Sequence, residues 1–196
     1  MNHRLQQINT TKTKTKKIMK STLRNTILVP ILTAALCSTF AAWAEDLEAK
    51  SAEAVQNFKT ADPGLTKFFD KAAGYAILPS VGEGGFIIGG QRGDGLVYEK
   101  DKLVGKVTMS EVSVGAQVGG GSFAELIFFE TEEALKDFQK SQWVMSAKAK
   151  ASVAASGVAE NAKYEQGVAV FTLPKKGVMV AAALGGQKFK FEAIKK

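Results

Sequence analysis

Apolar side chains recur with a helical period in three stretches of the chain. Residues 46–60 combine helix-forming residues with one apolar face, and residues 63–73 repeat that spacing after a break. Asp62 stands at the break, where its carboxylate can cap the second helix. Thr131 is a candidate N-cap for a third helix over residues 131–140, followed by acidic residues in the first turn. We therefore expect helices near the start and in the middle of the chain.

The other segments alternate apolar and polar residues, or run continuously apolar, as strands do. The predicted strands and strand-like alternations are residues 75–78 (ended by Pro79), 86–88, 96–98, 112–118, 123–129, 147–156, 168–173, 177–183 and 188–191. The predicted turns are Asp94-Gly95 as a hairpin, the charged residues 99–102, Pro174-Lys175-Lys176, and Gly185-Gly186.

Glycine is concentrated between Gly82 and Gly121, where twelve of the nineteen glycines lie. Glycine weakens a strand unless a sharp bend or a close backbone approach requires it, so this density predicts strong curvature. A phosphate-binding loop does not fit, because Ile87 stands where the third glycine of a dinucleotide fingerprint is needed. We predict an α+β fold: a curved, mostly antiparallel sheet or barrel-like core with flanking N-terminal and mid-chain helices.

The first 44 residues have the pattern of a secretory signal peptide. Seven basic and no acidic residues precede or enter a short apolar stretch, and Ala42-Trp43-Ala44 is a small-x-small cleavage sequence. We expect cleavage after Ala44 and a single domain over residues 45–196. The basic leader is long, and Met19 offers a later start that would give a signal peptide of ordinary length.

Cys37 raises the alternative of a lipoprotein. The residues before it, Ala34-Ala35-Leu36, invert the usual order of a leucine three residues earlier and a small residue immediately before. We therefore favour plain cleavage over lipidation, and expect a periplasmic or membrane-associated envelope protein.

Removing the leader changes the charge of the protein. The whole chain carries 26 basic and 19 acidic residues, and loss of the seven basic leader residues leaves a formally neutral remainder. A nucleic-acid partner is therefore not indicated. The remainder is asymmetric, acidic in residues 45–133 and basic in residues 134–196. These halves can attract each other within the fold or present a basic face to an anionic surface.

Processing also removes His3 and Cys37, the only histidine and cysteine. A chain without these residues lacks the groups for Ser-His-Asp or thiol catalysis, disulfides and ordinary zinc or haem ligation. We expect no catalytic residue, no cofactor and no metal. Carboxylate pairs remain the one catalytic alternative, but the acidic residues among the strands have no spacing that joins two of them.

Two sets of residues are candidates for contact with lipid. The pair Phe68-Phe69, flanked by lysines, has the composition of an interfacial helix, although a core position is the commoner role for such a pair. Lysines of the basic half can form a face for anionic head groups, or an ordinary solvated surface. The candidates are Lys67, Phe68, Phe69, Lys71, Lys148, Lys150, Lys175, Lys176, Lys188 and Lys190.

Several ordered motifs resemble the SYLF domain over about residues 46–193. They are Ala73-Gly74-Tyr75-Ala76-Ile77-Leu78, Gly84-Gly85-Phe86-Ile87-Ile88-Gly89-Gly90 with Arg92-Gly93-Asp94-Gly95-Leu96-Val97, Val114-Gly115-Ala116-Gln117-Val118-Gly119-Gly120, Phe128-Phe129, the alternation over 147–155 and Gly177-Val178-Met179-Val180. The resemblance implies a compact, mostly antiparallel β domain with flanking helices. It also implies phospholipid binding, with actin binding in some eukaryotic members.

Two departures limit what carries over. An exported chain is an improbable partner of actin, and residues 45–73 hold six acidic and four basic residues rather than a basic helix. The expected function is non-enzymatic binding of phospholipid or association with a membrane surface. The alternative is a structural or interaction protein of the cell envelope that binds another protein.

Overall fold

The computed structural model describes residues 28–140, 142–145, 151–153, 155–176 and 186–194. The chain divides into two compact units, residues 1–44 and 45–196. The boundary coincides with the predicted cleavage position, and cleavage itself stays a prediction. In the first unit the described part is helical and belongs to α1 (Leu28–Ala61), which continues through Ala44 into the second unit.

Helices of the second unit are short after α1. They are η1 (Pro63–Leu65), α2 (Thr66–Lys71), α3 (Glu132–Phe138) and α4 (Val158–Asn161). Asp62 caps η1 as expected, since its Oδ1 accepts from the Gly64 amide at 3.1 Å, and Thr131 caps α3. The helix predicted over 63–73 is thus two successive short helices.

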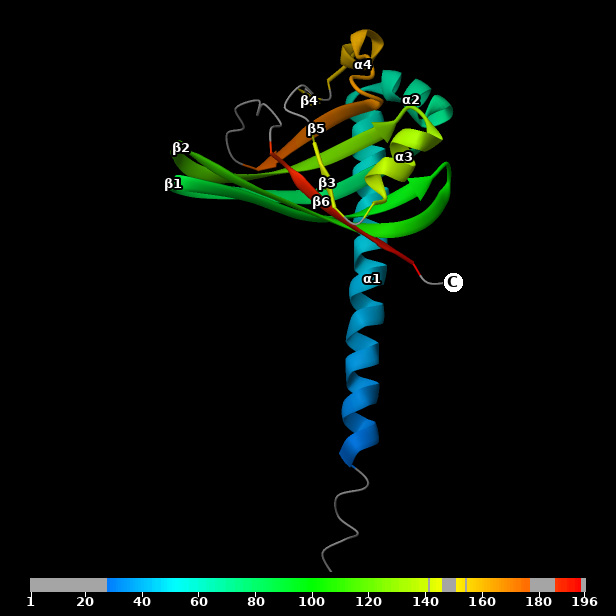
Figure 1. Cartoon of the computed structure of the whole chain (residues 1–196), viewed down its shortest axis with the longest axis vertical. Helices are drawn as coiled ribbons and strands as arrows, with labels where there is room; N and C mark the ends of the chain where they lie inside the picture. The colour runs from blue at the N-terminus through cyan, green and yellow to red at the C-terminus, as the bar shows by residue number, and fades with distance from the viewer. Residues whose placement is uncertain (1–27, 141, 146–150, 154, 177–185, 195–196) are drawn as a thin grey trace, which may run out of the picture. The chain divides into compact units, whose positions relative to one another are not determined.

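The strands form one six-stranded sheet with the order β3-β6-β2-β5-β4, and β1 pairs with β2 (Figure 1). Their bounds are β1 Gly74–Glu99, β2 Lys102–Phe129, β3 Trp143–Val144, β4 Ala151–Val153, β5 Val168–Lys176 and β6 Lys188–Ala193. All pairings are antiparallel except that of β4 with β5. The predicted α+β class, with a curved and mostly antiparallel sheet between helices, is confirmed.

Three predicted breaks in the strands are wrong. Pro79 lies within β1, and Asp94-Gly95 pairs with Thr108 and Val107 instead of turning. β5 runs through Pro174, which pairs with Phe123 at a register shift where an irregular ladder tolerates proline. The charged turn is correct, because Lys100 and Asp101 connect β1 to β2. The segment 177–183, Gly185 and, within 147–156, residues 147–150 and 154 lie outside the described residues.

Strong curvature brings the second half of β1 onto its first half. A Cβ on Gly93 would lie 2.8 Å from Val81 Cγ2 and 3.1 Å from the Ser80 carbonyl oxygen. A Cβ on Gly95 would collide with the carbonyl oxygen of Ile77. The register of β1 against β2 shifts between Phe86 and Ile88, in the glycine-rich region. Glycine here serves close approach, as its density predicted.

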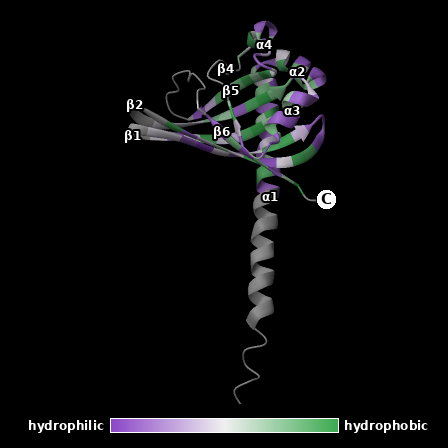
Figure 2. Ribbon diagram, in the orientation of Figure 1, coloured by the Kyte–Doolittle hydropathy of each residue, from purple (hydrophilic) through white to green (hydrophobic). Residues whose placement is uncertain are grey.

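Helices cover both faces of the sheet along residues 123–129 of β2, where the strand is largely apolar (Figure 2). Phe123, Ile127 and Phe129 belong to one core cluster, which α3 covers. The alternate residues Ala124, Leu126 and Phe128 belong to a second cluster with the 45–61 part of α1 and with α2. Burial on both faces explains why residues 123–129 form a continuous apolar run.

Gly95→Ala tests the close approach of Gly95 to the backbone of Ile77. We expect it to lower the free energy of unfolding by about 1–3 kcal/mol, because the new methyl overpacks against the Ile77 carbonyl. Gly84→Ala is the matched control, since a Cβ on Gly84 meets nothing within 4 Å. Urea denaturation followed by circular dichroism measures both. Equal effects of the two substitutions would contradict the packing argument.

Candidate functional site

The aromatic pair on α2 faces the protein interior. Phe68 is 4% exposed, and its ring centroid lies 5.3 Å from that of Phe128 and 5.2 Å from that of Phe171. Phe69 is partly buried against Phe128 and Tyr75, with Lys59 Nζ 4.5 Å above its ring. Phe68 is therefore a core residue instead of a lipid contact in this structure, the alternative that the sequence also allowed.

The two lysines of α2 have different surroundings. Lys67 Nζ donates to the Glu160 carbonyl oxygen at 3.1 Å and lies 5.2 Å from the centre of the Phe68 ring. Lys71, in the last turn, is exposed. Because Phe68 and Phe69 are packed inward, these lysines do not border an exposed apolar face formed by the pair.

The lysines of the basic half are only partly described. Lys148 and Lys150 lie outside the described residues, and Lys176 belongs to β5 with its side chain not described. Lys175 is exposed near the end of β5. Lys188 and Lys190 project from the exposed face of β6, on either side of the buried Phe189.

Strand register extends the exposed face of β6 across four strands. Arg92 on β1 pairs with Ser110 on β2, Ser110 pairs with Lys188 on β6, and Lys188 pairs with Val144 on β3. Partners directly opposite in a ladder project from the same face, so these exposed residues form one row. Val112 extends the row along β2, two residues from Ser110.

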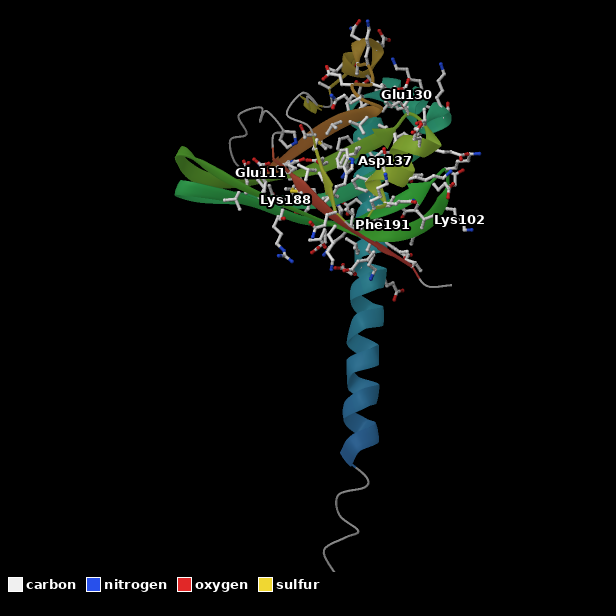
Figure 3. The ribbon with its side chains drawn as sticks, in the orientation of Figure 1. Lys102, Glu111, Glu130, Asp137, Lys188 and Phe191 are labelled. Carbon is white, nitrogen blue, oxygen red and sulfur yellow. The ribbon has the colours of Figure 1, made fainter. Side chains whose placement is uncertain are left out.

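We call this row the β6 patch, and it consists of Arg92, Ser110, Val112, Val144 and Lys188. Figure 3 labels Lys188 on β6. Val112 is 78% exposed and Val144 is 56% exposed. They are two of the three exposed large apolar residues among those described. Among the described residues, no ion pair includes Arg92 or Lys188. The patch therefore combines uncompensated positive charge with exposed aliphatic surface.

In the neighbouring row on the same face, formed by Asp94, Thr108 and Lys190, the charged groups have partners. Lys190 Nζ lies 2.6 Å from a carboxylate oxygen of Glu192, and both groups are solvent-exposed. Thr108 donates to Asp94 at 2.8 Å. Lys190, a predicted lipid contact, thus lies beside the patch with its charge already paired.

Sequence reasoning found Lys188 but missed Arg92, Val112 and Val144 as its neighbours. Val112 was recognised only as part of an alternating strand, and its exposure follows from that alternation once the buried face is known. Val144 lies 44 residues before Lys188, and only the pairing of β3 with β6 brings the two together.

A buried polar cluster lies on the face of these strands opposite the exposed β6 patch. Glu125 is fully buried among the residues of the first core cluster, and its Oε2 accepts from Gln187 Nε2 at 3.2 Å. Among the described residues, its Oε1 has no hydrogen-bond partner, nor do Gln187 Oε1, Gln91 Oε1 and Glu111 Oε2. Gln91 and Glu111 are register partners on β1 and β2. The buried oxygens are thus hydrogen-bond acceptors that lack donors.

Burial raises the pKa of Glu125 to about 7. The hydrogen bond from Gln187 lowers this pKa, and the nearby Glu111 raises it further, but both effects are smaller than desolvation. Burial, and then the charge of Glu83, also raise the pKa of Glu111. Glu125 consequently changes its charge near neutral pH.

Three further features concern metal ligands, membrane-spanning helices and hollows. Among the residues that the structure describes, no three carboxylate, imidazole or thiol groups come together to hold a metal ion. None of the described helices is both long enough and apolar enough to cross a membrane. An open hollow of about 510 Å³ beside the β1–β2 turn carries both signs of charge. It is lined by Ala73, Glu99, Lys100, Asp101, Lys102 and Glu132.

The chain is similar to Beta cell expansion factor A from Aeromonas veronii. The two are 25% identical over 130 residues, which covers 65% of this chain and 49% of the relative. The chain therefore spans about half the length of the curated relative it matches. No family model matches the chain.

The buried carboxyl predicts how stability depends on pH. Because the folded-state pKa of Glu125 is about 7 and its ordinary value is 4.5, the folded protein binds the extra proton between these pH values. The contribution of Glu125 to stability is therefore complete below pH 4.5 and is lost as pH rises to about 7. The loss is roughly 3 kcal/mol for a shift of this size.

Glu125→Gln should remove this dependence, because a neutral carboxamide does not titrate. Thermal or urea unfolding of the whole chain between pH 4.5 and pH 8 measures the effect. The exposed Glu53→Gln is the control and should leave the slope unchanged. A slope equal in wild type and Glu125→Gln would show that Glu125 is not responsible.

Proposed function

We propose that this protein is a SYLF-like domain that binds anionic phospholipid at a membrane surface through the β6 patch. The observation that carries the proposal is the row across four strands of exposed valines and of cations that form no ion pair with another described residue. The sequence motifs and the similarity to Beta cell expansion factor A support the family assignment. The proposal includes export, with the domain acting at the surface of an envelope membrane.

The chemistry of the patch matches the interface of a bilayer. A lysine or arginine near an anionic membrane contributes about 1 kcal/mol, so Arg92 and Lys188 contribute about 2 kcal/mol together. Val112 and Val144 add apolar area that can enter the region between head groups and acyl chains. The sum is small, so one domain would bind reversibly instead of permanently.

The neutral net charge of residues 45–196 makes the attraction local. A protein with a large positive charge is drawn to any anionic surface, whereas a neutral one is oriented by its charge distribution. Exposed charges act over about 8–10 Å at physiological ionic strength. The patch would therefore be the side that faces the membrane. The acidic residues around the β1–β2 turn would be repelled by an anionic surface only when they came close to it.

Charge reversal tests the electrostatic half of the proposal. Arg92→Glu with Lys188→Glu should reduce co-sedimentation with phosphatidylglycerol-containing vesicles by about tenfold or more, because roughly 2 kcal/mol of attraction becomes repulsion. Lys136→Glu with Lys163→Glu changes the net charge equally at exposed positions away from the patch. This control should retain most of the binding.

Equal losses in both double variants would show that net charge, not the patch, governs binding. If the unmodified protein binds neither anionic nor zwitterionic vesicles at low salt, the lipid proposal is wrong. The envelope protein that binds another protein would then be the better account.

Substitution of Val112 and Val144 tests the apolar contribution to the proposed membrane binding. Val112→Asp with Val144→Asp should abolish the binding that survives 0.5 M salt, since salt screens the charges but not apolar contact. Ile194→Asp is the matched control, because Ile194 is 42% exposed and lies at the other end of β6. Vesicle flotation at low and high salt measures both components. Salt-resistant binding by the double valine variant would exclude insertion of this patch.

A further inference from the structure

Gln187 joins the buried carboxyl to the β6 patch. Its side-chain amide donates to the Glu125 carboxylate at 3.2 Å, and its backbone carbonyl oxygen accepts from the Met145 backbone amide at 3.0 Å. Lys188 follows Gln187 directly, and Val144 directly precedes Met145. Two members of the patch are therefore anchored next to one fully buried glutamine, which is itself held by Glu125.

Within the described part of the chain, the groups that face Glu125 offer it no positive charge. Its register partners are Leu78 on β1 and Thr172 on β5, and both are neutral. The charged groups on this face are Glu111 on β2 and Glu83 on β1, which pairs with Gly121. From β6, Lys188 and Lys190 project to the opposite, exposed face. An ionised Glu125 would thus be a buried charge without a counterion among the described residues, and proteins relieve such a charge by opening to water.

A proton on Glu125 removes the buried negative charge and supplies a hydrogen-bond donor. The protonated Oε1 becomes a donor, and Gln187 Oε1 is an acceptor that has no partner. Together with the bond from Gln187 Nε2 to Oε2, this gives a carboxyl and a carboxamide joined by two complementary hydrogen bonds. Deprotonation removes the donor and leaves both Oε1 atoms unsatisfied inside the core.

We propose that Glu125 is a proton-operated latch for the β6 patch. The neutral carboxyl holds Gln187, and with it Lys188 and Val144, in the row, and the ionised carboxyl releases the start of β6. The predicted effect on lipid binding rests on the proposed function. The movement of β6 does not depend on lipid. Membrane binding is then stronger in mildly acidic than in mildly alkaline medium.

Trp143 is a built-in reporter of the latch. It pairs with Phe189 of β6, and the two ring centroids lie 5.6 Å apart. Trp43→Phe leaves Trp143 as the only tryptophan, since the chain has two. In that variant of the whole chain, Trp143 fluorescence should show a transition near pH 7, with faster amide exchange in residues 186–190 on the alkaline side.

Glu125→Gln added to Trp43→Phe should abolish the transition, because glutamine keeps both hydrogen bonds and does not titrate. Glu111→Gln should keep the transition and move it to lower pH, since Glu111 raises the pKa of Glu125. A transition that persists in Glu125→Gln, or the lack of any transition in Trp43→Phe, would overturn the latch.

Vesicle binding then tests the coupling. Co-sedimentation of the whole chain with phosphatidylglycerol vesicles should fall by about tenfold per pH unit above the transition until the latch is fully open. Arginine, lysine and the lipid phosphate keep their charges over this range, so they cannot cause the change. Glu125→Gln should bind equally at pH 6 and pH 8.5, and Gln187→Ala should bind weakly at both.

The two hypotheses fail differently. Absence of vesicle binding at every pH, with the Trp143 transition intact, would overturn the proposed function and leave the latch standing. Vesicle binding that does not change with pH in the wild-type chain would overturn the coupling and leave the proposed function standing.

Discussion

The close approach of Gly95 to the carbonyl oxygen of Ile77 is the constraint on which the sheet depends. It allows β1 to pack on itself, and β2 must follow the same curve because the two strands pair along their whole length. The curve sets one face of β2 against α3 and the other against α1 and α2. Glu125 lies in the part of β2 that is buried between these helices.

The elements that the sequence predicted correctly are those whose cause is local. Thr131 and Asp62 cap helices through their own neighbours, and the charged residues 99–102 turn because they favour water. Asp94-Gly95 was misread because the same pair suits a hairpin turn and a tight packing contact. Only the position of Ile77, eighteen residues earlier, decides between these roles.

The candidate site was less accessible to sequence reasoning, since it is made by register between distant strands. Lys188 was found from alternation within β6, but nothing local links it to Arg92 or Val144. Phe68 and Phe69 have the composition of an interfacial pair, and the aromatic residues that bury them come from β2 and β5. Glu125 is one of the acidic residues among the strands, and its burial could not be predicted, because helices that cover both faces of a strand cannot be read from the strand alone.

Two outer strands of the sheet are very short, β3 with two residues and β4 with three, whereas the long strand β1 pairs with β2 alone among the described strands. A free strand edge can pair with another copy of the same chain, and the hazard grows with the length of the edge. Molecules gathered on a membrane are concentrated in two dimensions, where such pairing is favoured. An edge of two or three residues offers too few backbone hydrogen bonds to nucleate such pairing, so in the described part of the fold the outer side of β1 is the edge on which a second copy could pair.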